Sequence, residues 1–172
     1  MKRNASATWV GDLRAGKGAV TTESGTLSQS RYLSGDAKGR GTNPYELVAA
    51  AHAACFSMAL ADELDGAGFT VHRIDTTATV MIEQLPAGRT ITCVQLDVLT
   101  KAPRAKQGDF IRAAVNAKTN CMISRLLKTY ICMSAKLENS ENRDTHKVRR
   151  PADSLKVLKT KKQSIGRSSL KG

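Results

Sequence analysis

The sequence predicts an α+β fold, because strand-like, helical and again strand-like segments follow one another along the chain. A long apolar segment from residue 44 to residue 65 is typical of one helix, and two long alternating segments after it are typical of a hairpin. The chain has 172 residues, a length that suits one domain with a substantial core.

Short segments rich in Thr and Val, separated by glycines, make up the first third of the chain. They are SATWV, GKGAVTTESG and residues 27–32. We expect them to form an antiparallel meander. A glycine-rich loop, GDAKGRG, leads from there to the long helix.

The start of the long helix carries a strong signal. Asn43 suits the cap position, Pro44 suits the first helical position, and Glu46 is placed to reach back to the cap amide. The helix is expected to run to about residue 65 and to end at Gly66.

Two alternating segments, 70–84 and 89–100, predict the hairpin, with LPAG as its connection. Asp109 is expected to cap a helix that runs to about residue 118. A shorter helix is expected to start at Cys121, and residues 130–137 are expected to form the last strand.

The net charge of +12 is concentrated near the C-terminus. Residues 139–172 hold ten Lys or Arg and three Asp or Glu, and no aromatic side chain on which bases stack. We interpret 1–138 as the domain and 139–172 as a basic, poorly ordered extension, with a weak polyanion-binding arm as the alternative. This distribution argues against a nucleic-acid-binding domain. We find no leader segment and no apolar stretch approaching a membrane span, so we expect a soluble, cytoplasmic protein without a membrane partner.

Four scattered cysteines contain no Cys-x-x-Cys pair, which argues against zinc and against a secreted disulfide scaffold. Cys55 lies in the alanine-rich middle of the long helix, where a cysteine taken alone is most often a core residue. Cys121 lies at a helix start, whose free amides stabilise an anion. We interpret Cys93 and Cys132 as structural and His52 as a hydrogen-bonded core residue.

Several motifs resemble the osmotically inducible protein C and organic hydroperoxide resistance family (OsmC/Ohr). They are GTNPYELVAAAHAACFSMAL, NCMISRLL, ICMSAKLE and, upstream, TWVGDLRAGKGAVTTESGTL. The likeness covers residue 5 to about residue 138, and TWVGD, GKG and GTNP are typical of the osmotically inducible branch.

The resemblance implies an intertwined homodimer with antiparallel sheets, a long central helix and two sites at the subunit interface. Cys55 matches the peroxidatic cysteine and Cys121 the resolving cysteine, although Met122 replaces the usual proline. Glu46 matches the glutamate that pairs with an arginine beside the thiolate. The family's arginine segment is shortened here to SGDAKGRG, which leaves Arg31 and Arg40 as candidates.

The implied activity is a peroxidase that reduces organic hydroperoxides to alcohols through a Cys55 sulfenic acid and a disulfide with Cys121. The implied reductant is an external dithiol, of which a lipoylated protein is one kind, and the reaction needs no metal, haem or flavin. The apolar surroundings of Cys55 favour alkyl and fatty-acid hydroperoxides over hydrogen peroxide. The alternatives are a peroxide-sensing or polyanion-binding module without turnover, and a purely structural role for the cysteines.

Overall fold

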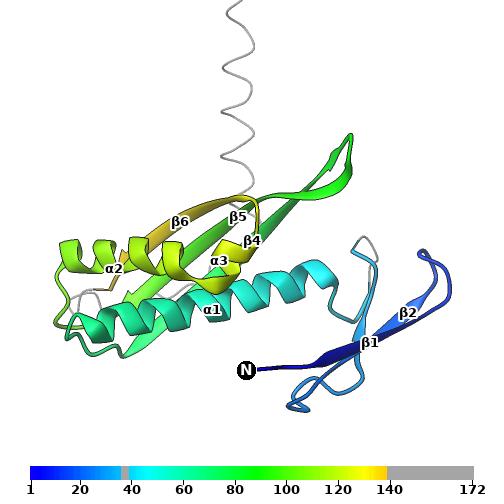
Figure 1. Cartoon of the computed structure of the whole chain (residues 1–172), viewed down its shortest axis with the longest axis horizontal. Helices are drawn as coiled ribbons and strands as arrows, with labels where there is room; N and C mark the ends of the chain where they lie inside the picture. Colours follow the sequence, from blue (N-terminus) through cyan, green and yellow to red (C-terminus); the bar gives the residue numbers. More distant parts are fainter. Residues whose placement is uncertain (36–38, 139–172) are drawn as a thin grey trace, which may run out of the picture. The chain divides into compact units, whose positions relative to one another are not determined.

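A computed structural model describes residues 1–35 and 39–138, and it has the α+β architecture that the sequence predicts (Figure 1). The basic extension expected for residues 139–172 lies outside this range. In chain order the elements are β1 (Ala5–Val10), β2 (Lys17–Thr22), β3 (Ser30–Tyr32), α1 (Pro44–Gly66), β4 (Arg73–Leu85), β5 (Gly88–Lys101), α2 (Gln107–Asn120), α3 (Met122–Leu126) and β6 (Tyr130–Leu137).

The first three strands form an antiparallel meander in the order β1-β2-β3. Gly18 lies between Trp9 and Tyr32 in this register, and a Cβ at Gly18 would lie 2.3 Å from the Tyr32 ring. The missing side chain lets the two aromatic rings meet at a centroid distance of 5.5 Å across the middle strand. β3 starts later than the sequence suggests, because Gln29 has a φ of 47° that no strand residue adopts.

Helix α1 begins where the sequence predicts. The Asn43 side chain accepts hydrogen bonds from the amides of Tyr45 at 3.0 Å and Glu46 at 2.9 Å, so two of the free amides of the first turn are satisfied. The Glu46 carboxylate accepts a hydrogen bond from the Thr42 hydroxyl at 3.0 Å, rather than from the cap amide that the sequence suggests. The helix ends at Gly66, one residue beyond the predicted end.

The second sheet is mixed, which corrects the expectation of antiparallel sheets. Strands β4 and β5 form the predicted antiparallel hairpin, but β5 and β6 run parallel. Parallel neighbours need a long crossover connection, and here α2 and α3 supply it. Helix α2 begins at Gln107 with Lys106 at its cap position, so Asp109 lies in the first turn and pairs with Arg112 instead of capping the helix.

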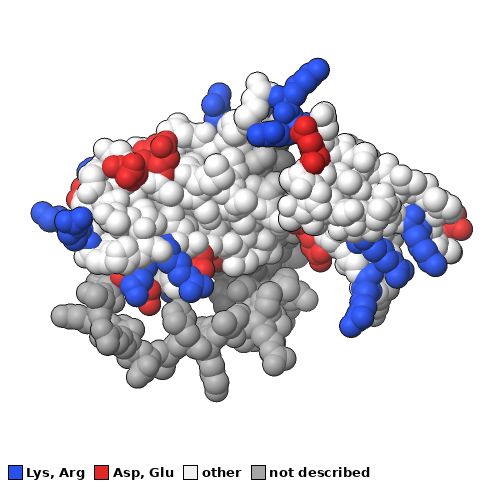
Figure 2. Space-filling view, turned by 90° about the horizontal axis from the view of Figure 1, so that it is seen from below, with Lys and Arg blue, Asp and Glu red and all other residues white. Residues whose placement is uncertain are grey.

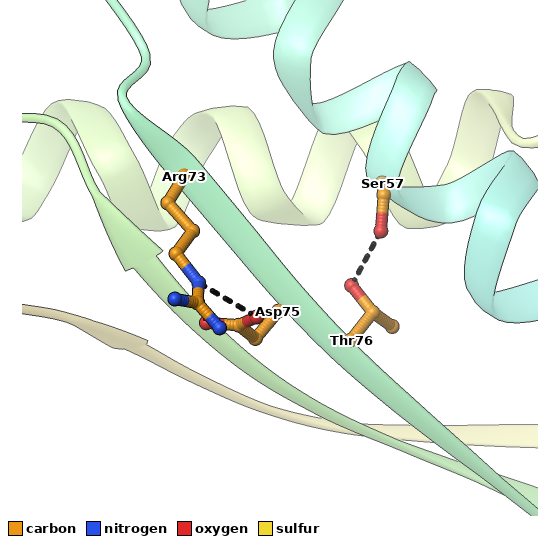
Figure 3. Close-up of polar contacts among 4 residues, drawn as sticks. All are labelled: Ser57, Arg73, Asp75 and Thr76. Atoms are coloured by element: carbon orange, nitrogen blue, oxygen red, sulfur yellow. Dashed lines mark hydrogen bonds and ion pairs between the residues drawn. The ribbon is translucent and has the colours of Figure 1, made fainter.

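Helices α1 and α2 pack on one face of this sheet and enclose the core. A hydrogen bond of 2.8 Å from Ser57 of α1 to Thr76 of β4 ties the central helix to the sheet, while the neighbouring ion pair of Arg73 with Asp75 lies on the other face of the strand (Figure 3). The fully buried large side chains of the core are Phe56, Leu60, Leu64, Val94, Leu96 and Phe110.

The opposite face of α1 is apolar and exposed. Ala51, Ala54 and Met58 lie on it, and Met58 is 74% exposed. Charged side chains of both signs surround an uncharged area on the face of the molecule drawn in Figure 2. By length and composition alone α1 would pass for a membrane span, with a mean hydropathy of 1.4, which the sequence analysis did not anticipate. Core helices of globular proteins pass the same test, and α1 buries its other face in the core.

Candidate active site

Two of the sequence-predicted site residues, Cys55 and Cys121, meet beneath α1. Cys55 lies in the middle of the helix and is half-buried. Cys121 is 1% exposed and lies at the break between α2 and α3. The two thiols are close enough for Cys121 to raise the pKa of Cys55, although the cysteines lie 66 positions apart along the chain. The structure therefore brings Cys55 near Cys121, which no local sequence pattern could establish.

The break between α2 and α3 directs backbone amides at the Cys55 sulfur. The Cys121 amide donates a hydrogen bond to Ala117 and ends α2, and its extended backbone then turns the chain into α3. In this turn the amides of Ile123 and Met122 lie near enough to Cys55 to lower its pKa. The sequence pointed to free amides at this helix start, and the structure shows that they serve the cysteine of the other helix.

Opposing effects act on the pKa of Cys55. Burial raises the pKa of this thiol most strongly, and the Cys121 thiol raises it further. The amides of Ile123 and Met122 act in the other direction, because they stabilise the thiolate. The net result within one chain is a pKa above the ordinary value of a cysteine, which leaves the thiol mainly protonated at neutral pH.

His52 is fully buried one turn before Cys55, as expected of a hydrogen-bonded core residue. Its Nε2 lies 2.8 Å from the Ser124 hydroxyl of α3, and burial lowers the pKa of His52, so the ring is neutral. This hydrogen bond fixes α3, and with it the amides that face Cys55, to α1. The sequence analysis missed Ser124, since a serine 72 residues away carries no local signal.

Glu46, Arg31 and Arg40 do not join the thiols in the described chain. Glu46 is exposed and bonds to Thr42, whose amide in turn donates to the Arg31 carbonyl at 3.1 Å. Arg31 and Glu46 thus lie at the N-terminal end of α1. Nine helical residues separate Glu46 from Cys55, about 13 Å along the axis and on the opposite side of the helix. Arg40 is exposed, and no hydrogen bond or ion pair joins it to these groups within residues 1–35 and 39–138.

The other two cysteines also lie close together, which the sequence did not indicate. Cys93 of β5 and Cys132 of β6 bring their sulfur atoms to 3.8 Å. Their contact follows from the parallel pairing of two strands that the crossover connects.

Within residues 1–35 and 39–138, no three His, Cys, Asp or Glu side chains group together. A cavity of about 810 Å³ lies at the N-terminal end of α1. Trp9, Tyr32 and Tyr45 line it and neither Cys55 nor Cys121 does, so the thiol chemistry belongs outside this cavity.

Comparison with known proteins identifies the family to which this fold belongs. The family model described as OsmC-like protein matches residues 35–135. The peroxiredoxin OsmC of Escherichia coli is 42% identical over 142 residues, which cover 80% of this chain and 97% of that protein. The fold and the site together define a class of α+β proteins that have a thiol pair at the central helix. Within that class the chain belongs to the OsmC-like protein family.

Solved structures share the fold at low sequence identity. An OsmC-like protein of unknown function from Vibrio cholerae matches with a TM-score of 0.67 and 14% identity, over 79% of this chain and 99% of that chain. The organic hydroperoxide resistance protein OhrB of Bacillus subtilis matches with a TM-score of 0.59 and 19% identity, over 78% of this chain and 98% of that chain.

Proposed function

We propose that this protein is a cysteine-based peroxidase that reduces organic hydroperoxides in the cytoplasm. A peroxide-related redox function follows from the likeness to peroxiredoxin OsmC over nearly the whole of that protein. The observation that supports the finer proposal is that the Cys121 thiol and the amides of Met122 and Ile123 lie near enough to Cys55 to act on its pKa.

The reaction begins when the Cys55 thiolate attacks the terminal oxygen of the hydroperoxide. The O–O bond breaks, the alkoxide takes up a proton and leaves as an alcohol, and Cys55 becomes a sulfenic acid. The amides of Met122 and Ile123 stabilise the thiolate before the attack.

Cys121 completes the cycle as the resolving residue. Its sulfur attacks the Cys55 sulfur, the S–O bond breaks, water leaves, and a disulfide forms. The two thiols already lie near one another, so this step joins neighbouring side chains. An external dithiol, such as a lipoylated protein, then reduces the disulfide by exchange. The apolar side chains around Cys55 favour alkyl and fatty-acid hydroperoxides.

Two cysteine variants test this assignment. Cys55→Ser should abolish the reduction of cumene hydroperoxide, whereas Cys121→Ser should permit one oxidation per subunit and no turnover with dithiol. Cys93→Ser is the matched control, since it removes a thiol on the other face of the sheet. Undiminished turnover of Cys55→Ser would refute the proposal, and oxidation of both thiols without turnover would favour a peroxide sensor.

The active unit in this proposal is a homodimer with shared sites. Glu46 and Arg31 lie at one end of α1, too far from Cys55 of the same chain to act on it. The exposed alanine and methionine face of α1 allows close approach of a second helix. A second copy then brings its Glu46 and arginine to the Cys55 of its partner.

Mixed dimers test the shared site. Cys55→Ser chains and Glu46→Ala chains, each inactive alone, are unfolded and reassembled together in equal amounts. Half of the dimers are then mixed, and one of their two sites is undamaged, so about a quarter of the wild-type activity should return. No recovery, or a fully active monomer in sedimentation at assay concentration, would contradict the shared site.

A further inference from the structure

We propose that Cys93 and Cys132 form a second dithiol, which an alkyl hydroperoxide oxidises to a disulfide that joins β5 to β6. Their sulfur atoms lie 3.8 Å apart, whereas the sequence suggested two unrelated structural cysteines. The two pairs have no residue in common, so the inference does not depend on turnover at Cys55.

Both cysteines lie on the face of the sheet that the helices leave open. Along β5, Val94 and Leu96 are buried against the helices, and along β6, Ile131 and Met133 pack against the same core. Successive residues of a strand point to opposite faces. Cys93 and Cys132 therefore point away from the helices, and both are half-buried within reach of solvent.

The parallel register places the two cysteines on a diagonal. Cys93 lies opposite Tyr130, and Cys132 lies opposite Gln95 on β5. The side chains lean toward one another across this diagonal, and the two thiols hydrogen bond. A disulfide has an S–S distance of about 2.05 Å, so the sulfurs must approach by about 1.8 Å to form the bond.

A strand irregularity beside Cys93 supplies the freedom for this movement. The pairing of β4 with β5 shifts between Met81 and Ile82, so Thr92 is left without a partner in the β4 register next to Cys93. The ladder is locally interrupted at such a bulge, and the bulged strand adjusts there at lower cost than in the middle of a regular ladder.

The oxidation balances with the hydroperoxide as the only oxidant. One thiolate of the pair attacks the terminal oxygen, the O–O bond breaks, and an alcohol leaves. The second thiol attacks the resulting sulfenic sulfur and releases water, so two electrons pass from the two thiols to the peroxide. Burial raises the pKa of Cys93, and the Cys132 thiol raises it further, so little of the Cys93 thiol is ionised at neutral pH. We expect the pair to require excess hydroperoxide.

The test uses the full chain with Cys55→Ser and Cys121→Ser, in which Cys93 and Cys132 are the remaining thiols. Excess cumene hydroperoxide should remove both thiols of one chain, lower its intact mass by about 2 Da and leave it monomeric in mass on a non-reducing gel. Dithiothreitol should restore both thiols. Peptide mapping should find a peptide with Cys93 joined to a peptide with Cys132.

A third substitution, Cys93→Ser in that background, is the matched control and should gain oxygen at Cys132 instead of losing mass. Two thiols that stay titratable, oxygen added to each cysteine singly, or a crosslink between chains would each overturn the inference. If the double variant does not fold, mapping the wild-type chain after excess hydroperoxide gives the same answer. There the Cys93 to Cys132 bond and the Cys55 to Cys121 bond appear as separate peptides, so failure of either proposal is distinguishable from failure of the other.

Discussion

The pKa of Cys55 is set by opposing effects of the groups around its side chain. Burial dominates its pKa, and two amides compensate only in part. No guanidinium contacts its sulfur in the part of the chain that the structure describes. A thiol in this state reacts slowly at neutral pH, since only the thiolate attacks. The proposed partner arginine would provide the missing cation, which predicts a measurable effect of pH.

We predict that Arg31→Ala raises the pKa of Cys55 in the assembled protein, because a cation near a thiolate lowers its pKa. Since the thiolate fraction falls with a higher pKa, the single-turnover rate at pH 7 should fall by about tenfold or more and recover as the pH rises. Stopped-flow oxidation of the Cys121→Ser background from pH 6 to pH 10 measures this.

Arg31→Lys is the charge-preserving control, and Arg40→Ala tests the second candidate in the same way. A pH profile that neither arginine variant changes would show that the Met122 and Ile123 amides suffice without a cation.

The hydrogen bond between α1 and α3 holds the turn that carries Cys121. His52 is buried with its Nε2 bonded to Ser124, and the turn between α2 and α3 carries both Cys121 and the two amides. A buried polar group that loses its hydrogen-bond partner lowers the free energy of unfolding by about 1–3 kcal/mol. Because the turn carries these amides as well as Cys121, loosening this link should slow both the first attack and disulfide formation.

Ser124→Ala tests the role of this link. We expect a loss of about 1–3 kcal/mol in the free energy of urea unfolding, and slower oxidation of both Cys55 and Cys121 when free thiols are titrated over time after peroxide addition. Ser57→Ala is the matched control, because it removes a 2.8 Å hydrogen bond of the same helix to β4. If both variants slow thiol oxidation equally, the His52–Ser124 hydrogen bond contributes only to the general stability of the fold.

Local sequence patterns predicted most of the secondary structure. They did not predict the pairing of strands and cysteines that are far apart in the sequence. The cap at Asn43, the hairpin and the last strand follow from short patterns, and the structure confirms them. The parallel direction of β6 depends on how α2 and α3 cross the sheet, which periodicity does not encode. The contact of Cys93 with Cys132 was missed for the same reason, whereas the motif resemblance had already paired Cys55 with Cys121.

For the protein as a whole, the excess positive charge and the chemistry lie in different segments. Truncation after Glu138 removes ten Lys or Arg and none of the matched motifs. Peroxidase activity should stay within about a factor of two at moderate salt, because charges more than about 10 Å from the site are screened. Steady-state assays of the truncated and full chains check this. A large loss with an unchanged circular dichroism spectrum would assign the extension a role in the reaction.

The crossover between β5 and β6 also fixes the order in which the chain can fold. The β4–β5 hairpin is local and closes within microseconds, whereas β6 must wait until the whole crossover has been arranged. Cys121 lies on that crossover, so its place beneath Cys55 is secured only when the last strand docks. An oxidant that arrives earlier meets four free thiols in an open chain and joins them at random. Refolding yield should consequently be higher in a reducing buffer, with oxidation applied after the fold is complete.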